Sequence, residues 1–240
     1  MIDLYSSTTP NVLKVILMLE ETGLDYTLKP VNVWKGEQFE PTFVALNPNS
    51  KVPVIVDHDD PDGPYAVFES VAILIYLAEK TGRFLPAFGR ARHDVMQWLI
   101  FQAANIGPAN GQFNHFERFA GPGNDYSMSR YTTELKRLYG VMERRLGETP
   151  YLGGNDYSIA DMATFPWVLI QSRRLGASFP FLDRNSGHYA DISAWLTRCE
   201  ERPDVQRALA VHAKMTSAVA TATSDDLDRM FGRGSFAFKG

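Results

Sequence analysis

The sequence predicts an α/β domain that is followed by an all-helical domain. Up to residue 81, short apolar segments with strand-like patterns alternate with helical ones, and beyond residue 91 the apolar spacing is helical. Between them, residues 82–91 contain glycine and proline and are typical of a linker. We therefore expect domains at residues 1–81 and 92–213, with residues 214–240 as a C-terminal extension.

The first domain is predicted to have the element order βαβαββα. Thr9-Pro10 starts the first helix, because threonine caps a helix N-terminus well and proline fits the first turn. That helix ends at Gly23 and joins two strands that we expect to be parallel. The expected strands cover residues 2–5, 26–33, 52–56 and 66–68, and the further helices cover residues 41–46 and 70–80.

The second domain is predicted to contain only helices. They cover residues 92–119, 127–146, 158–174 and 189–202, and a short last helix starts at Pro203. Ser158 and Asp161 have the spacing of a capping box, in which the side chain of each residue bonds the backbone of the other. We therefore assign this segment a role in folding and no role in catalysis.

The composition is typical of a globular protein that binds neither nucleic acid nor membranes. Hydrophobic residues make up 45% and charged residues 22%, and the net charge is −4, whereas nucleic-acid-binding domains usually carry a basic surplus. No apolar run approaches the ~20 residues of a membrane span, and the N-terminus lacks the pattern of a signal peptide. The single cysteine, Cys199, excludes an internal disulfide and a CxxC redox pair, so we expect a reducing, cytoplasmic location.

Several familiar kinds of catalytic site are missing from the sequence. The five histidines are scattered, and none has a partner at ligand spacing on one helix face, so we expect no metal site. The glycine pairs lack the strand-before, helix-after context of a phosphate-binding loop, and there is no Gly-x-Ser-x-Gly motif. Ordinary nucleophile–base catalysis therefore has little support.

Two short motifs in the first domain suit a peptide ligand with charged ends. Val52-Pro53 enters a strand after a polar loop, where a cis bond would turn the Val52 peptide groups toward an extended ligand. A trans proline at the start of a strand is the alternative. Glu69-Ser70 lies between a strand and a helix, so Ser70 as N-cap could hold a carboxylate and Glu69 an ammonium group. A simple helix cap would use the same residues.

Hydroxyl and amide side chains gather at residues 6–11, where the first helix begins. A thiolate would be stabilised at this position, and lowering a thiol pKa by about two units takes about 2.7 kcal/mol. A helix terminus contributes roughly 0.3–1 kcal/mol and a hydrogen bond to a charged group about 1.5–3 kcal/mol, so both are needed. Alternatively, Thr9 serves only to cap the helix.

In order and spacing, these motifs resemble those of the glutathione transferases over residues 1–211. The resemblance rests on Thr9-Pro10-Asn11 and on residues 49–53, 68–73 and 157–161. Within the superfamily, residues 1–5, residues 35–39 and Arg130-Tyr131 resemble the bacterial Nu class and the fungal Ure-type proteins. Members of that group reduce disulfides with glutathione, often show modest transferase activity on electrophiles, and use no catalytic cysteine.

The resemblance implies a thioredoxin-like N-terminal domain that binds glutathione as co-substrate, an α-helical C-terminal domain, and a homodimer. It implies that Thr9 and Asn11 hydrogen-bond the glutathione sulfur, and we rank them above Ser7 and then Tyr5 as catalytic residues. The other implied glutathione-binding residues are Gln38 and Lys51 at the glycyl end, Val52 and Pro53 at the cysteinyl backbone, Glu69 and Ser70 at the γ-glutamyl end, and Arg130 at a second glutathione or its disulfide.

The function that we expect is attack by the bound glutathione thiolate on a small-molecule disulfide or electrophile. Bound glutathione supplies the reactive sulfur, and the protein binds it, orients it and stabilises its charge. The alternative is a glutathione-binding regulatory or scaffold protein that retains the fold without turnover.

Overall fold

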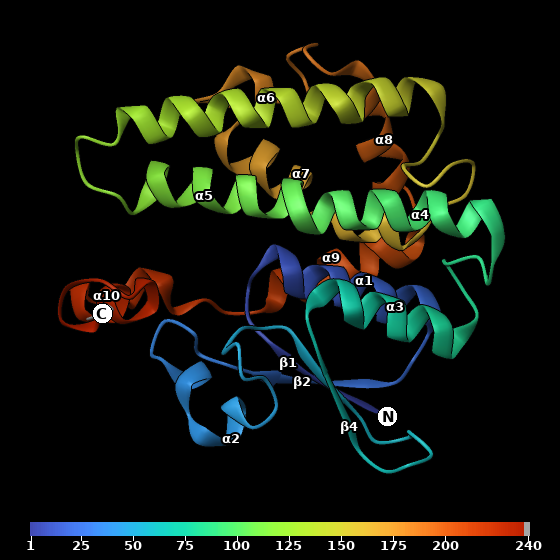
Figure 1. Ribbon diagram of the computed structural model, residues 1–240, viewed down its shortest axis with the longest axis horizontal. Helices are drawn as coiled ribbons and strands as arrows, with labels where there is room; N and C mark the ends of the chain where they lie inside the picture. The colour runs from blue at the N-terminus through green and yellow to red at the C-terminus, as the bar shows by residue number, and fades with distance from the viewer. Residues whose placement is uncertain (238–240) are drawn as a thin grey trace. The chain divides into compact units, whose positions relative to one another are not determined.

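The computed structural model describes residues 1–237 (Figure 1). By their internal contacts, these residues form two compact units. The first unit comprises residues 1–73 together with the C-terminal segment from Arg207 onward, and the second comprises residues 74–206. In the described part of the chain, no helix combines the length and the apolar character needed to cross a bilayer.

A four-stranded mixed sheet in the order β2-β1-β3-β4 forms the centre of the first unit. β1 pairs with β2 in parallel, which confirms the predicted βαβ unit, and it pairs with β3 antiparallel. Leu4 is fully buried and lies opposite Leu28 on one side and Ile55 on the other. The strands are β1 (Ile2–Ser6), β2 (Tyr26–Pro30), β3 (Val54–Asp57) and β4 (Tyr65–Phe68).

The helices of the first unit begin and end close to their predicted positions. Thr9 caps α1 (Pro10–Thr22), and Gly23 ends it with φ 70°, a left-handed conformation that glycine adopts without steric cost. α1 runs above the strands (Figure 1), and α3 (Ser70–Thr81) begins in the first unit and continues into the second, whose first residue is Leu74. A 3₁₀ turn, η1 (Glu37–Phe39), and α2 (Pro41–Val44) lie between β2 and β3.

Two strands are shorter than predicted. β2 ends at Pro30 and not at residue 33, and β3 begins at Val54 and not at residue 52. Proline has no N–H to donate to a neighbouring strand, so regular pairing stops where Pro30 and Pro53 stand.

The second unit is helical, as predicted. Its capping box is also confirmed, since Asp161 accepts hydrogen bonds from the Ser158 backbone N–H and from the Ser158 hydroxyl. The elements are α4 (Gly89–Phe101), η2 (Gln102–Ile106), α5 (Gly107–Arg118), α6 (Asp125–Glu148), α7 (Ile159–Leu175), η3 (Pro180–Leu182) and α8 (Ala190–Glu200), and α9 (Pro203–Lys214) leads back to the first unit.

The predicted helix over residues 92–119 is present, but it contains a π-helical turn that the sequence did not predict. α4 begins earlier, at Gly89, and the π-helical turn η2 (Gln102–Ile106) separates it from α5. Pro108 follows this turn, and its ring lacks an N–H and would clash with the carbonyl of Ala104 in a regular α-helix. A wider π turn accommodates the proline without ending the rod of α4 and α5 (Figure 1).

The C-terminal extension folds onto the loop that follows β2. It contains η4 (Ala218–Thr221), α10 (Ser224–Phe231) and η5 (Gly234–Phe236). Lys35 Nζ lies 2.5 Å from Asp226 Oδ2, and the rings of Trp34 and Phe231 meet edge-on with centroids 6.5 Å apart. Met230 adds to the apolar cluster beneath this loop. These contacts join segments that are about 190 residues apart in the sequence, as the Lys35–Asp226 pair shows.

Candidate functional site

Residues from three separate segments of the first unit line a cavity of about 280 Å³. The segments are the start of α1, the loop before β3, and the turn between β4 and α3. Six of the lining residues are ones that the sequence singled out: Asn11, Lys51, Val52, Pro53, Glu69 and Ser70. Asn47 and Asn49 complete its lining, and we call this cavity the small cavity.

Asparagine side chains hold the loop before β3 in place. Asn47 is 1% exposed, donates from Nδ2 to the carbonyl of Lys51 at 2.7 Å, and accepts the Asn49 N–H at 2.9 Å. The peptide bond between Val52 and Pro53 is cis, so the trans alternative is not present. Asn47 and Asn49 are not among the predicted site residues, although asparagines that bond their own backbone are typical of tight loops.

Glu69 occupies the turn between β4 and α3 in a strained conformation. Its φ is 67°, in the left-handed region that is uncommon for residues other than glycine. Its carbonyl accepts the N–H of Ile73 at 2.9 Å, and its carboxylate accepts the Asn49 Nδ2–H at 3.2 Å. Such strain at a cavity is typical of functional sites.

The expectation that Ser70 is the N-cap of this helix is wrong by one position. α3 begins with Ser70, and Glu69 is the residue that caps it through its carbonyl. The reason is the left-handed turn at Glu69, which already brings the chain onto the helical path at Ser70. The backbone N–H of Ser70 still belongs to the first turn, whose N–H groups have no intrahelical acceptor.

A buried lysine lies directly behind this turn. Lys14 is 2% exposed, and its Nζ donates to Ser70 Oγ at 3.3 Å. Burial lowers the pKa of Lys14 to about 7, and the negative charge of Glu69 opposes this shift. Lys14 is not among the predicted site residues, although a lysine inside the apolar run of residues 12–19 was the available signal.

Thr9 has the capping role that was its alternative interpretation. Its Oγ1 accepts the N–H of Val12 at 3.2 Å, and His212 of α9 lies close to the carbonyl of Thr9. Burial lowers the pKa of His212. A hydroxyl that accepts one bond can still donate its own proton, so capping leaves Thr9 able to bond a nearby sulfur.

Gln38 and Arg130 are placed differently from the residues of the small cavity. Gln38 is 2% exposed and lies under α10, where its Nε2 donates to Met230 Sδ at 3.4 Å. Arg130 belongs to the second unit, on α6, with a largely exposed side chain 3.7 Å from Glu134 Oε2. Their assigned roles at a glutathione remain predictions.

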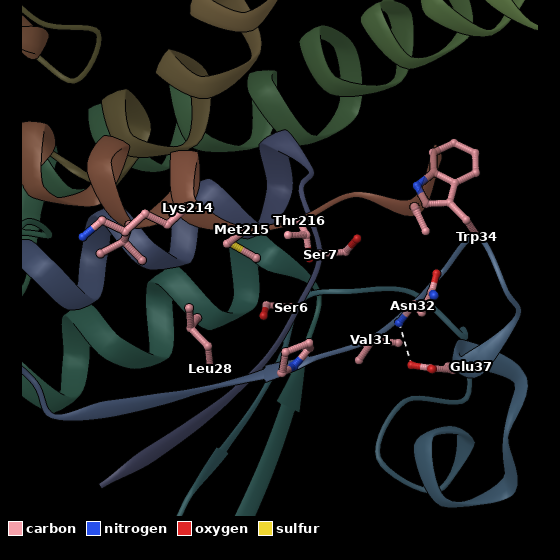
Figure 2. A pocket seen from close by; sticks show the side chains of 13 residues that line it. Ser6, Ser7, Leu28, Val31, Asn32, Trp34, Glu37, Lys214, Met215 and Thr216 are labelled. Atoms are coloured by element: carbon pink, nitrogen blue, oxygen red, sulfur yellow. Dashed lines mark hydrogen bonds between the residues drawn. The ribbon is translucent and has the colours of Figure 1, made fainter. Parts of the chain in front are cut away.

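Two serines from the hydroxyl-rich segment before α1, Ser6 and Ser7, line another, larger cavity of about 560 Å³ (Figure 2). Ser6 and Ser7 face it from the end of β1, and the C-terminal segment closes it with Met215 and Thr216. Ser6 is 1% exposed, and its Oγ has no hydrogen-bond partner among the described residues. Tyr5 packs edge-on against Phe43 with ring centroids 6.0 Å apart, in agreement with a packing role.

Cys199 lies in the core of the helical unit. The side chain is fully buried, and burial raises the pKa of its thiol well above the ordinary value. A thiol that stays protonated is a poor nucleophile, so the protein's own sulfur is unsuited to exchange. Across residues 1–237, no group of three or more His, Cys, Asp or Glu side chains is arranged to hold a metal ion.

Comparison with known proteins agrees with this architecture. Residues 8–80 match the glutathione S-transferase N-terminal domain model, and residues 127–203 match the glutathione S-transferase C-terminal domain model. The disulfide-bond oxidoreductase YfcG of Escherichia coli is 45% identical over 212 residues, which cover 87% of this chain and 94% of that protein.

Two solved structures show the same fold with glutathione bound. A glutathione transferase family member from Pseudomonas fluorescens, with two glutathione bound, is 41% identical, with TM-score 0.80 over 87% of this chain and 92% of that one. Glutathione transferase URE2P6 of Phanerochaete chrysosporium, in complex with oxidized glutathione, is 30% identical, with TM-score 0.82 over 90% and 97%. The expected resemblance to Ure-type proteins and disulfide reductases is thereby confirmed, and the chain belongs to the glutathione S-transferase family.

Proposed function

We propose that this protein binds glutathione in the small cavity and uses its thiolate to reduce disulfides or to attack small electrophiles. One observation carries the proposal. The residues that the family resemblance implied at the γ-glutamyl and cysteinyl parts of the ligand come from separate segments, yet they line the same cavity. The names of the relatives add support, because YfcG is a disulfide-bond oxidoreductase and the related structures contain glutathione.

Each part of the tripeptide finds a group of matching chemistry. The γ-glutamyl ammonium pairs with the Glu69 carboxylate, and the α-carboxylate pairs with the Ser70 hydroxyl and the first N–H groups of α3. The backbone of Val52 bonds the cysteinyl residue as a neighbouring strand would. Lys51 and Gln38 receive the glycyl carboxylate, and Gln38 exchanges its contact with Met230 for this bond.

The start of α1 stabilises the thiolate. Thr9 is the N-cap of α1 and Asn11 lies in its first turn. A hydrogen bond from either side chain adds about 1.5–3 kcal/mol to the effect of the helix dipole. The thiolate attacks one sulfur of a disulfide, forms a mixed disulfide, and releases the other sulfur as a thiolate that takes up a proton. A second glutathione thiolate then attacks the glutathione sulfur of the mixed disulfide, which yields glutathione disulfide and the second reduced thiol.

The finer assignments belong to the same proposal. Arg130 contacts the second glutathione, the chain is a Nu-class homodimer in the cytoplasm, and its domains divide at residues 82–91. The two glutathione molecules in the Pseudomonas fluorescens structure support a second glutathione site, and the two family models, which match residues 8–80 and 127–203, support a division between those ranges.

Calorimetry and paired assays test the proposal. Purified protein should bind reduced and oxidised glutathione, and should reduce hydroxyethyl disulfide faster than free glutathione does, with a second assay on chlorodinitrobenzene for conjugation. Binding without turnover on either substrate would select the regulatory or scaffold alternative. If neither form of glutathione binds, the proposed function is wrong.

Replacing Asn11 by alanine should separate catalysis from binding. If the Asn11 amide stabilises the thiolate, Asn11→Ala should lower the disulfide-reduction rate by about 10- to 100-fold and weaken the binding of reduced glutathione only a few-fold. Steady-state kinetics and calorimetry on the same preparation measure both effects. Equal losses would mean that Asn11 only helps to hold the ligand.

Replacing Cys199 should leave catalysis intact. Because the thiol is buried and protonated, Cys199→Ala should keep both glutathione-dependent rates within about twofold of wild type. In the native protein, a chromogenic thiol reagent should label Cys199 only after denaturant is added. Loss of the disulfide rate in a folded Cys199→Ala variant would contradict a mechanism in which glutathione supplies the sulfur.

A further inference from the structure

Lys14 has an unusual position for a lysine in the first unit. The side chain enters from α1, is buried to 2% exposure, and ends with Nζ 3.3 Å from Ser70 Oγ. Ser70 is 8% exposed and lines the small cavity, so its hydroxyl has the lysine on one side and the cavity on the other. Ser70 therefore connects Lys14 to the small cavity.

The protonation state of Lys14 determines which way the Ser70 hydroxyl can point. An ammonium group only donates, so a charged Lys14 makes Ser70 Oγ the acceptor and leaves the hydroxyl proton for a second acceptor. A neutral amine can accept, and it then competes for that same proton. A carboxylate in the small cavity is consequently bound best when Lys14 is charged.

Burial and the nearby charge of Glu69 leave Lys14 with comparable charged and neutral populations at neutral pH. Burial lowers its pKa to about 7, and the carboxylate of Glu69 in the turn before α3 acts in the opposite direction. Other titratable groups on the surrounding elements include Lys51 in the loop before β3, Glu20 and Glu21 further along α1, and His212 on α9. α3 carries Tyr76, Glu79 and Lys80 beyond its first turn. An added anion within about 4–6 Å typically moves such a pKa by one to three units, so a ligand carboxylate would favour the charged lysine.

We infer that Lys14 is a positioning residue that takes up a proton when the α-carboxylate of a γ-glutamyl ligand binds at Ser70. This inference rests on the proposed function, since it names the group behind the γ-glutamyl part of the same site. The lysine does not touch the ligand: it orients the Ser70 hydroxyl and supplies a charge that appears on binding. Affinity should then fall as the pH rises, because binding at high pH must also charge the lysine.

Calorimetry with S-methylglutathione tests the inference, since this ligand has no thiol to titrate. Titrations in phosphate and in Tris, whose ionisation enthalpies differ, should show an uptake of roughly half a proton or more near pH 7.5. Between about pH 6.5 and pH 8.5, the affinity should fall roughly tenfold. His212 does not produce this effect, because burial lowers its pKa and it is already neutral in this range.

Matched variants assign the proton to Lys14. Lys14→Met nearly keeps the length of the side chain and removes its charge. It should abolish the proton uptake, and its affinity should stay near the value that wild type shows at high pH, independent of pH. Lys14→Arg stays charged over the whole pH range, so its affinity should be independent of pH and close to that of wild type at low pH. Lys80→Met, which removes an exposed lysine on α3, should behave as wild type.

The outcomes separate this inference from the proposed function. If wild type binds S-methylglutathione without proton uptake, or if folded Lys14→Met retains the full uptake, the role of Lys14 is wrong and the binding site still stands. If wild type does not bind S-methylglutathione or glutathione at all, the proposed function is wrong. The buffer comparison on wild type decides the matter even if the Lys14 variants do not fold.

Discussion

Glu69→Gln is expected to weaken the binding of glutathione by about 10- to 100-fold. The substitution removes one negative charge and retains the size of the side chain. Hydrogen bonds to charged groups contribute about 1.5–3 kcal/mol, and each 1.4 kcal/mol corresponds to a tenfold change in affinity. Calorimetry with oxidised glutathione measures the effect without interference from a titrating thiol.

The geometry around Glu69 explains why one carboxylate can have so large an effect. Its left-handed backbone and the bond from Asn49 Nδ2 hold the carboxylate at the wall of the cavity. A group already held in place loses little conformational entropy when the ligand arrives. Asn49→Ala should therefore weaken binding as well, by a smaller factor, because the carboxylate remains but is no longer held.

A ligand without the α-amino group makes the test specific. Glutaryl-cysteinyl-glycine lacks the ammonium that Glu69 would pair with, so Glu69→Gln should cost it little further affinity. Glu79→Gln is the matched control, since Glu79 is an exposed glutamate on α3 that pairs with Arg92. If Glu69→Gln lowers the affinity for both ligands equally, Glu69 does not recognise the ammonium group.

The parts of the fold that the sequence predicted are those with local signals. Thr9-Pro10 and Gly23 mark the two ends of α1 through capping preferences that act within a few residues. Val52-Pro53 and Glu69-Ser70 are likewise dipeptides whose chemistry is visible in the chain. Their convergence on one cavity follows from the βαβαββα order, which brings the loops after β1, before β3 and after β4 together.

The features that sequence analysis missed depend on contacts between distant segments. Gln38 is covered by Met230, and no local pattern indicates that the C-terminal extension returns to this loop. The burial of Lys14 depends on contacts between α1 and distant segments such as Ser70. An amphipathic pattern predicts which face of a helix is buried, but it does not predict which residues that face contacts. The π turn before Pro108 is a different case, because the proline can be read from the sequence, but the sequence does not show that a π turn lets the helix continue past it.

Asp161→Ala is expected to lower the free energy of unfolding of the helical unit by about 3–5 kcal/mol. Asp161 is fully buried, and it accepts hydrogen bonds from the Leu152 N–H at 2.9 Å and from Trp195 Nε1 at 2.9 Å. It also accepts from the backbone and the hydroxyl of Ser158. Alanine would leave these buried donors without their acceptor, and each unsatisfied donor costs about 1–3 kcal/mol.

The second capping box of this chain is the control that separates burial from capping. Thr223 and Asp226 make the same reciprocal bonds at the start of α10, but they do so in contact with solvent. Burial raises the pKa of Asp161, whereas Lys35 and the cap bonds lower the pKa of Asp226 to about 2. The stability contributed by Asp226 is therefore present above the ordinary pKa of an aspartate and is lost as the pH falls toward 2.

Because water can replace the bonds of an exposed cap, Asp226→Ala should lower the free energy of unfolding of its own unit, the first, only slightly, whereas Asp161→Ala should lower that of the helical unit strongly. Urea denaturation followed by far-UV circular dichroism measures both variants, and hydrogen exchange at Leu152 and Ser158 reports on the donors themselves. Equal effects of the two substitutions would mean that the cap geometry, and not the burial of its donors, determines the loss. A strong effect at Asp161 alone identifies the turn before α7 as a buried polar junction on which the packing of Trp195 depends.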